Sequence, residues 1–282
     1  MKRYFIILSC IMGGLTCQHP EQKAKQVALV KHQSMEIEVK DLNASNYPWY
    51  NRLKSNNTLS KRIALPQDFD RIPVDEGSFG DWLRNLPLRK PNSKVYYYND
   101  DEKFTQEIHA AVVDIDIGDK DLQKSEDAVI RLWAEYLYSQ QNYESIIIPT
   151  EEDTLIFTDY YTDQPNYAQF RKFLNLAFEK TTPYSFKKSL EVIKIKSLKI
   201  GDIFVQSSPP GHAVIIVDMA KNEAEQRIFL LAQAFTPAQD LHILKNFDNA
   251  STLGSWYPTN FGTTLYTPEW EFSSNDIRRM KH

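Results

Sequence analysis

The stretch from Gly201 to Asp218 reads GDIFVQSSPPGHAVIIVD and decides the fold of this chain. It predicts a short strand, a turn rich in proline and glycine, and a buried strand that begins at His212. The next apolar run, RIFLLAQA from Arg227 to Ala234, follows a polar turn at Asn222–Glu225. The two runs predict an antiparallel hairpin in which His212 lies almost opposite Gln233.

His212 and Gln233 together are typical of one half of a hydrolytic site. A histidine held by a polar side chain of the next strand acts as the base that activates a nucleophile. The nucleophile is expected at a helix N-terminus, where the helix dipole and the imidazole lower the pKa of a thiol. The best such helix begins at Ser125, so Ser125, His212 and Gln233 are the candidate catalytic residues.

Each candidate also has an ordinary structural role. Serine often caps the N-terminus of a helix, and this is the commoner role for a residue such as Ser125. His212 can be a structural histidine at a turn, and Gln233 can bind backbone groups alone. His109 leads an alternating strand and is more often packed than catalytic.

The segment from Ser125 to Gln141 is the clearest helix. Its apolar residues recur at three- and four-residue spacing and predict one buried stripe. Asp127, Arg131 and Glu135 form a charged row on another face. Weaker patterns predict helices at 78–88, 167–178 and 185–192, and strands at 95–98, 109–115, 146–148, 154–157 and 241–244.

Composition and charge exclude several classes of function. The chain of 282 residues is 42% hydrophobic, which is ample for a packed core. It has 33 basic and 37 acidic residues and a net charge of −4, with only short basic runs. Nucleic acids require clustered positive charge, so no nucleic-acid partner is expected. No cofactor or metal is expected either, because the zinc-protease and phosphate-loop motifs are missing.

The N-terminus is typical of a targeting segment. Lys2 and Arg3 precede an apolar run, Tyr4–Leu15, that is too short to span a bilayer. The sequence GLTC resembles a bacterial lipobox and predicts lipidation of Cys17; Cys10 has better flanks, but its apolar run would be too short. Plain secretion or a retained anchor is the alternative. Beyond Cys17 there is no cysteine for a disulfide, a nucleophile or a thiolate metal site.

We therefore expect three parts: a lipoprotein signal peptide (1–17), a polar tether (18–45) and a single α+β domain (46–282). The protein is expected to be exported. The lipid on Cys17 would hold it to the periplasmic or outer-membrane face of the bacterial cell envelope.

Several segments resemble a family of secreted or lipidated proteins from Bacteroidetes-type bacteria that is known only as a domain of unknown function. The resemblance covers roughly residues 60–275. It rests on SFGDWLRNLPL (Ser78–Leu88), DLQKSEDAVIRLWAEYLY (Asp121–Tyr138), PGHAVIIVD (Pro210–Asp218), LAQAFTPAQD (Leu231–Asp240) and PEW (Pro268–Trp270).

The resemblance implies a fold and a site. The helix start of that family usually reads QQCADA, and here it reads QKSEDA (Gln123–Ala128), so Ser125 stands at the cysteine position. In plan the family is similar to NlpC/P60 and other papain-like hydrolases, which implies a papain-like α+β fold with a helix packed on an antiparallel sheet. A serine hydroxyl is far less acidic than a thiol, whose pKa is about 8.5. Since Gln233 is also neutral, weak or absent hydrolysis is expected.

Three functions remain open. The first is a lipoprotein with a papain-like cleft that binds a peptide or a peptidoglycan fragment, with little or no catalysis. The second is an active serine-variant amidase or peptidase acting on cell-wall peptides. The third is a glycan-binding or structural envelope protein that uses aromatic clusters such as Tyr96–Tyr98 and Trp256–Tyr257, although such clusters more often pack in a core.

Overall fold

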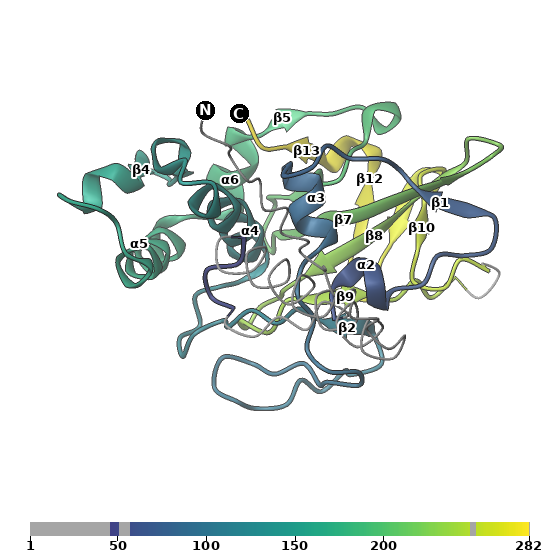
Figure 1. Ribbon diagram of the computed structural model, residues 1–282, viewed down its shortest axis with the longest axis horizontal. Coiled ribbons are helices and arrows are strands. Elements are labelled where there is room, and N and C mark those ends of the chain that lie inside the picture. Colours follow the sequence, from purple (N-terminus) through teal and green to yellow (C-terminus); the bar gives the residue numbers. More distant parts are fainter. Residues whose placement is uncertain (1–45, 51–56, 249–251, 282) are drawn as a thin grey trace, which may run out of the picture. The chain divides into compact units, whose positions relative to one another are not determined.

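The predicted hairpin lies at the centre of the structure. In the computed structural model, β7 (His212–Asn222) pairs antiparallel with β8 (Arg227–Gln233) (Figure 1). The chain reverses between them through a turn in which the Glu225 N–H donates to the Asn222 carbonyl oxygen at 3.0 Å. The prediction of a hairpin around Asn222–Glu225 is confirmed.

The structure describes residues 46–50, 57–248 and 252–281. All of them belong to one unit, Leu42–His282. The predicted signal peptide (1–17), the predicted tether up to residue 45, and Cys17 lie outside the described residues. No helix in the described ranges is long and apolar enough to cross a membrane.

Nine strands of the described chain form one sheet, and every pair in it is antiparallel. Their order across the sheet is β2 (His109–Val112), β9 (His242–Leu244), β8, β7, β6 (Ile203–Gln206), β13 (Ile277–Arg279) and β5 (Glu191–Val192). In addition, β1 (Phe69–Arg71) pairs with β7, and β10 (Tyr257–Pro258) pairs with β8. The hairpin therefore forms the middle of the sheet.

The expected papain-like α+β fold, with a helix packed on an antiparallel sheet, is wrong. A nine-stranded antiparallel sheet dominates the described chain, and helices are few. Four of these strands, β1, β5, β10 and β13, have only two or three residues each and come from segments remote from the hairpin. Strands this short carry no usable periodicity, so the sequence pattern could not reveal the extent of the sheet.

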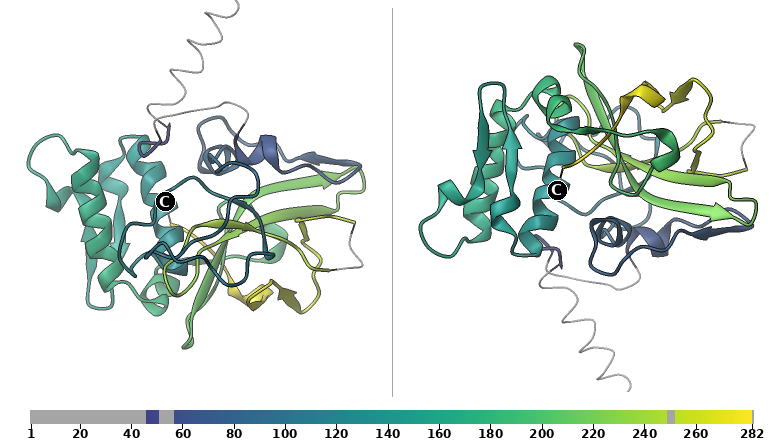
Figure 2. Two further views of the ribbon diagram at one scale, coloured as in Figure 1. Left: turned by 90° about the horizontal axis from the view of Figure 1, so that it is seen from below. Right: turned by 90° about the horizontal axis from the view of Figure 1, so that it is seen from above.

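The alternation of side chains along β7 separates two cores. Ala213 and Ile215 belong to a larger core that includes side chains of the helices, whereas Val214 and Ile216 belong to a smaller one with Phe272. Successive side chains of a strand point to opposite faces, so His212 lies on the side of the smaller core. Figure 2 shows the blue N-terminal and yellow C-terminal elements on opposite faces of the green strands, with the teal helices beside them.

The helix predicted from Ser125 is confirmed as α4 (Ser125–Ser139), but its charged row is buried. The side chains of Arg131 and Glu135 are 0% exposed and form an ion pair at 3.2 Å. The hydroxyl of Tyr167, the first residue of α5 (Tyr167–Lys180), donates to Glu135 at 2.7 Å. The row that the sequence places on a separate face is therefore covered by a neighbouring helix.

A bulge in β7 joins the sheet to two preceding elements. The pairing with β8 shifts between Ile216 and Asp218. The buried Asp218 carboxylate accepts hydrogen bonds from Arg71 of β1 and from Arg84 of α3 (Phe79–Arg84), each at 2.7 Å. Two charge-assisted bonds compensate the buried carboxylate and tie β1 and α3 to β7.

Most of the other predicted elements are present with shifted ends. Segment 95–98 is the exception, because Tyr96 and Tyr97 form only isolated bridges. The remaining described elements are α2 (Leu59–Arg62), α6 (Pro183–Ser189), β3 (Ile147–Pro149), β4 (Thr154–Ile156), β11 (Thr264–Tyr266), β12 (Glu271–Ser273), η1 (Tyr143–Ser145), η2 (Phe157–Tyr160), η3 (Ile195–Ser197) and η4 (Ser274–Asp276).

Replacing Gly211, the residue before β7, should destabilise the fold. A Cβ atom there would lie 2.5 Å from Pro183 Cβ and 3.0 Å from the Gln206 carbonyl oxygen. We expect Gly211→Ala to lower the free energy of unfolding by about 1–3 kcal/mol, measured by urea unfolding. Gly80→Ala is the matched control, because its nearest neighbour is at 3.4 Å. Equal stability of the two variants would contradict this prediction.

Candidate functional site

His212 stands at the first position of β7, and its imidazole ring is buried among aromatic rings. Only 2% of the residue is exposed. The ring centroids of Phe235, Trp270 and Phe272 lie 4.5, 5.1 and 5.9 Å from the imidazole centroid. Burial lowers the pKa of His212 to about 4, against a smaller opposing effect of its hydrogen bond with Gln233. The imidazole is therefore neutral near pH 7.

Gln233 holds His212, although the two residues are not directly opposite. Ile215 lies opposite Ala232, and the same register continued by one residue sets Gln233 opposite Val214. Gln233 is therefore a diagonal neighbour of His212 across the two strands. The distance from His212 Nε2 to Gln233 Oε1 is 3.1 Å. An amide oxygen only accepts, so this hydrogen bond assigns the proton to Nε2 and the lone pair to Nδ1.

The amide nitrogen of Gln233 is also engaged. It donates to Glu269 Oε2 at 2.6 Å and lies 3.4 Å from His242 Nε2. His242 Nδ1 lies 2.8 Å from the Asp240 carbonyl oxygen, which assigns the lone pair of His242 to Nε2. Burial lowers the pKa of His242 to about 3. The amide of Gln233 therefore has one orientation, with both of its donors and its acceptor in use.

The ammonium group of Lys103 completes the arrangement. Its Nζ lies 2.8 and 3.0 Å from the two carboxylate oxygens of Glu269 and donates to Gln239 Oε1 at 2.7 Å. Lys103 is buried, so the Glu269 carboxylate compensates a charge that is otherwise costly to desolvate. We call the following five residues the histidine cluster: Lys103, His212, Gln233, His242 and Glu269.

Ser125 is not joined to this cluster by any hydrogen bond of the described residues. Its Oγ donates to Glu126 Oε2 at 2.8 Å. The next turn of α4, including Val129, packs in the same core as Ala213, on the face of β7 opposite to His212. The structure thus brings His212 and Gln233 together. No hydrogen bond of the described residues joins Ser125 to them, and the joint catalytic role of the three remains a prediction.

The expected capping role of Ser125 is not observed either. Ser125 is the first residue of α4, and Lys124 occupies the N-cap position. The Lys124 N–H donates to the Asp127 carboxylate at 3.2 Å. Burial, reinforced by the neighbouring Glu126, raises the pKa of Asp127 well above its ordinary value. The N-terminus of α4 is thus capped by the side chain of Asp127, a residue of the helix itself.

Sequence reasoning missed Lys103, His242 and Glu269. Glu269 and Trp270 lie in the PEW motif, which is part of the family resemblance but to which the sequence assigns no function. Lys103 stands alone in a polar loop with no pattern around it. Its contact with Glu269 spans 166 residues of chain, a separation that only the folded structure closes.

The cluster offers one free basic atom beside aromatic surface. Among the described residues, the one side-chain hydrogen bond of His212 is to Gln233, which leaves the Nδ1 lone pair as an acceptor. Phe235 and Trp270 are each partly exposed. This arrangement can accept a hydrogen bond and stack on a flat ligand. Among the described residues, no group of three or more His, Cys, Asp and Glu side chains is placed to hold a metal ion.

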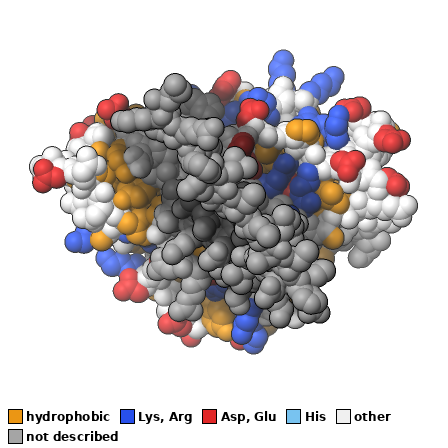
Figure 3. Space-filling view, viewed as in Figure 1, with side chains coloured by type: hydrophobic (Ala, Val, Ile, Leu, Met, Phe, Trp, Pro, Cys, Tyr) orange, Lys and Arg blue, Asp and Glu red, His pale blue; other side chains and the backbone are white. Residues whose placement is uncertain are grey.

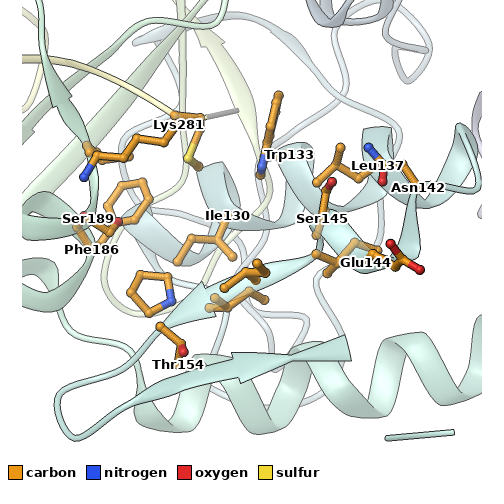
Figure 4. A pocket seen from close by; sticks show the side chains of 17 residues that line it. Ile130, Trp133, Leu137, Asn142, Glu144, Ser145, Thr154, Phe186, Ser189 and Lys281 are labelled. Atoms are coloured by element: carbon orange, nitrogen blue, oxygen red, sulfur yellow. Dashed lines mark hydrogen bonds between the residues drawn. The ribbon is translucent and has the colours of Figure 1, made fainter. Parts of the chain in front are cut away.

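An apolar cavity of about 610 Å³ lies beside α4, and none of Ser125, His212 and Gln233 lines it. Figure 4 shows Ile130, Trp133 and Leu137 of α4 around it, together with Phe186 of α6. In Figure 3, hydrophobic side chains gather at the left of the molecule, over the region of α5 and β4. This cavity is therefore separate from the histidine cluster.

The fold and the cluster define an antiparallel β-sheet protein with a buried, neutral histidine pair at one end of its central strands. The chain belongs to the family described as domain of unknown function (4846), whose sequence model matches residues 59–162 and 147–279. No curated protein matches the chain, and no solved structure does.

The two buried histidines should make stability depend on pH. In the unfolded chain they take up protons below about pH 6.5, whereas the folded pKa values are about 4 for His212 and about 3 for His242. The unfolded state then binds more protons, so the free energy of unfolding should fall as the pH drops from 6.5 to 4. The expected loss is roughly 1.4 kcal/mol per pH unit for each histidine.

Urea unfolding of the wild type at pH 6.5, 5.5 and 4.5 measures this slope. The double variant His212→Gln, His242→Gln should show a clearly shallower dependence, since glutamine does not titrate. An unchanged slope in the double variant would show that other groups cause the acid sensitivity.

Proposed function

We propose that this protein binds a peptide or a peptidoglycan fragment at the histidine cluster and does not hydrolyse it. The observation that carries the proposal is a neutral His212, held through Nε2 by Gln233, with Nδ1 left as an acceptor beside Phe235 and Trp270. Peptide N–H groups and sugar hydroxyls are donors for such an acceptor. Peptide planes and sugar rings can pack on exposed aromatic faces.

The contacts of Ser125 support binding rather than hydrolysis. A nucleophile must lie within hydrogen-bond reach of its base. Ser125 Oγ instead donates to Glu126, and no hydrogen bond of the described residues joins it to His212. The aromatic alternative at Trp256–Tyr257 is weaker, because both residues are buried in the described structure.

The proposal includes an envelope location in a bacterium, with Cys17 as the lipidated residue. It is supported by the short apolar run after Lys2 and Arg3 and by the GLTC sequence that ends at Cys17. An envelope location would place the histidine cluster where cell-wall peptides are present.

Binding can be tested with a soluble disaccharide–tetrapeptide fragment of peptidoglycan, titrated into the full-length protein by calorimetry. We expect saturable binding that Trp270→Ala weakens at least about tenfold, because an aromatic anchor often contributes more than 1.4 kcal/mol. Phe247→Ala is the control, since Phe247 is 52% exposed and is not one of the rings that contact His212. Ser125→Ala should leave the affinity unchanged.

Two results would overturn the proposal. One is the absence of binding at millimolar fragment. The other is cleavage of the fragment, detected by mass spectrometry, that Ser125→Ala abolishes; this would identify a serine hydrolase instead.

Lipidation can be tested separately by growing cells that produce the full chain with an alkyne-tagged fatty acid. We expect label on the wild type and on Cys10→Ala, and no label on Cys17→Ala, because the lipid is attached through the Cys17 thiol. Labelled Cys17→Ala protein, or loss of label in Cys10→Ala, would contradict the assignment.

A further inference from the structure

A second cavity, of about 300 Å³, lies beside the edge strand β2, and none of the five residues of the histidine cluster lines it. Its lining residue His109 contacts His242 of that cluster, with ring centroids 6.0 Å apart. Its lining includes Lys90, Asn92, Ser93, Lys94, His109 and Lys245. These residues come from the loop before residue 95, from β2 and from the position directly after β9, which the fold brings together. A volume near 300 Å³ is at the lower end of the range for small-ligand sites.

The charge of this cavity is unbalanced. Three of its lining residues are lysines, and none is acidic. Lys94 is paired with Glu102 at 2.6 Å. Among the described residues, neither Lys90 nor Lys245 has a carboxylate partner within ion-pair distance. Two lysines without an ion-pair partner among the described residues therefore line one small cavity, although the net charge of the chain is negative.

Polar groups that lack ionic partners line the same cavity. His109 Nε2 lies 2.9 Å from the Ser93 carbonyl oxygen, which assigns the proton of that imidazole to Nε2. His109 Nδ1 is buried and has no hydrogen-bond partner among the described residues, but as a lone-pair acceptor it donates no hydrogen bond to an anion. No hydrogen bond of the described residues uses the Asn92 side chain, which is exposed and able to donate.

We propose that this cavity binds a phosphate dianion, either free or as the terminal group of a small phosphomonoester. The two uncompensated ammonium groups match the charge of a phosphomonoester, which is about −1.5 to −2 near pH 7. Lysine acts as a point charge toward phosphate oxygens, and an amide can add a hydrogen bond. This inference is independent of ligand binding at the histidine cluster.

The test is calorimetric titration of the full-length protein with inorganic phosphate and, separately, with glycerol phosphate at low ionic strength. We expect saturable binding of at least one of them. Lys90→Gln combined with Lys245→Gln should weaken it at least about tenfold, since both charges act at close range. Tighter binding of glycerol phosphate would identify a phosphomonoester site, and tighter binding of inorganic phosphate would identify a site for the free ion.

Lys120→Gln combined with Lys188→Gln is the matched control, because it removes the same charge from exposed positions outside the cavity. This control should bind phosphate as the wild type does. Equal weakening in both double variants would overturn the proposal in favour of a long-range charge effect. The absence of saturable binding in the wild type, whose fold is intact, would also overturn it.

Discussion

The structure depends on one constraint: the backbone of the buried strand β7 must find hydrogen-bond partners on both of its edges. Nine of its eleven residues are buried, so few of its backbone groups can turn to water. β8 pairs along one edge, while β6 and β1 divide the other. Where the ladder shifts at the bulge, Asp218 accepts from Arg71 and Arg84 and fastens two earlier elements to the strand. The requirement explains why β8, β6 and β1 pair with β7 at the middle of the sheet.

The histidine cluster follows from the same requirement, that buried polar groups have hydrogen-bond partners. His212, the first residue of β7, is only 2% exposed, so the Nε2–H group needs an acceptor from the protein. The amide oxygen of Gln233 accepts the hydrogen bond from His212 Nε2, and its amide nitrogen donates to Glu269 and lies near His242 Nε2, so one amide orients two imidazoles. Apart from the His212 Nδ1 lone pair, the imidazoles and the Gln233 amide of this network are paired, and moving any of them would leave a buried partner without its hydrogen bond. Rigidity of this kind suits recognition of a ligand by a fixed acceptor.

Local patterns predicted the parts of this molecule better than their assembly. The hairpin, the helix from Ser125 and the helix from Tyr167 were readable, because each has a periodicity carried by consecutive residues. The papain-like arrangement was not correct, since strands of two or three residues complete the sheet from distant segments. The charged row of α4 was misjudged for a related reason: which helix face meets solvent depends on where α5 packs.

The sequence alone determined that His212 begins a buried strand and that Gln233 comes close to it on the next one. Both statements depend on alternation and on a turn of a few residues, which are short-range properties of the chain. Only the tertiary structure decided that Lys103, His242 and Glu269 surround this pair, and that the side chains of α4 pack on the opposite face of the strand. The separations along the chain range from nine positions for Gln233 and His242 to 166 for Lys103 and Glu269. In each case burial and charge compensation in the whole fold select the partner, and no local pattern does.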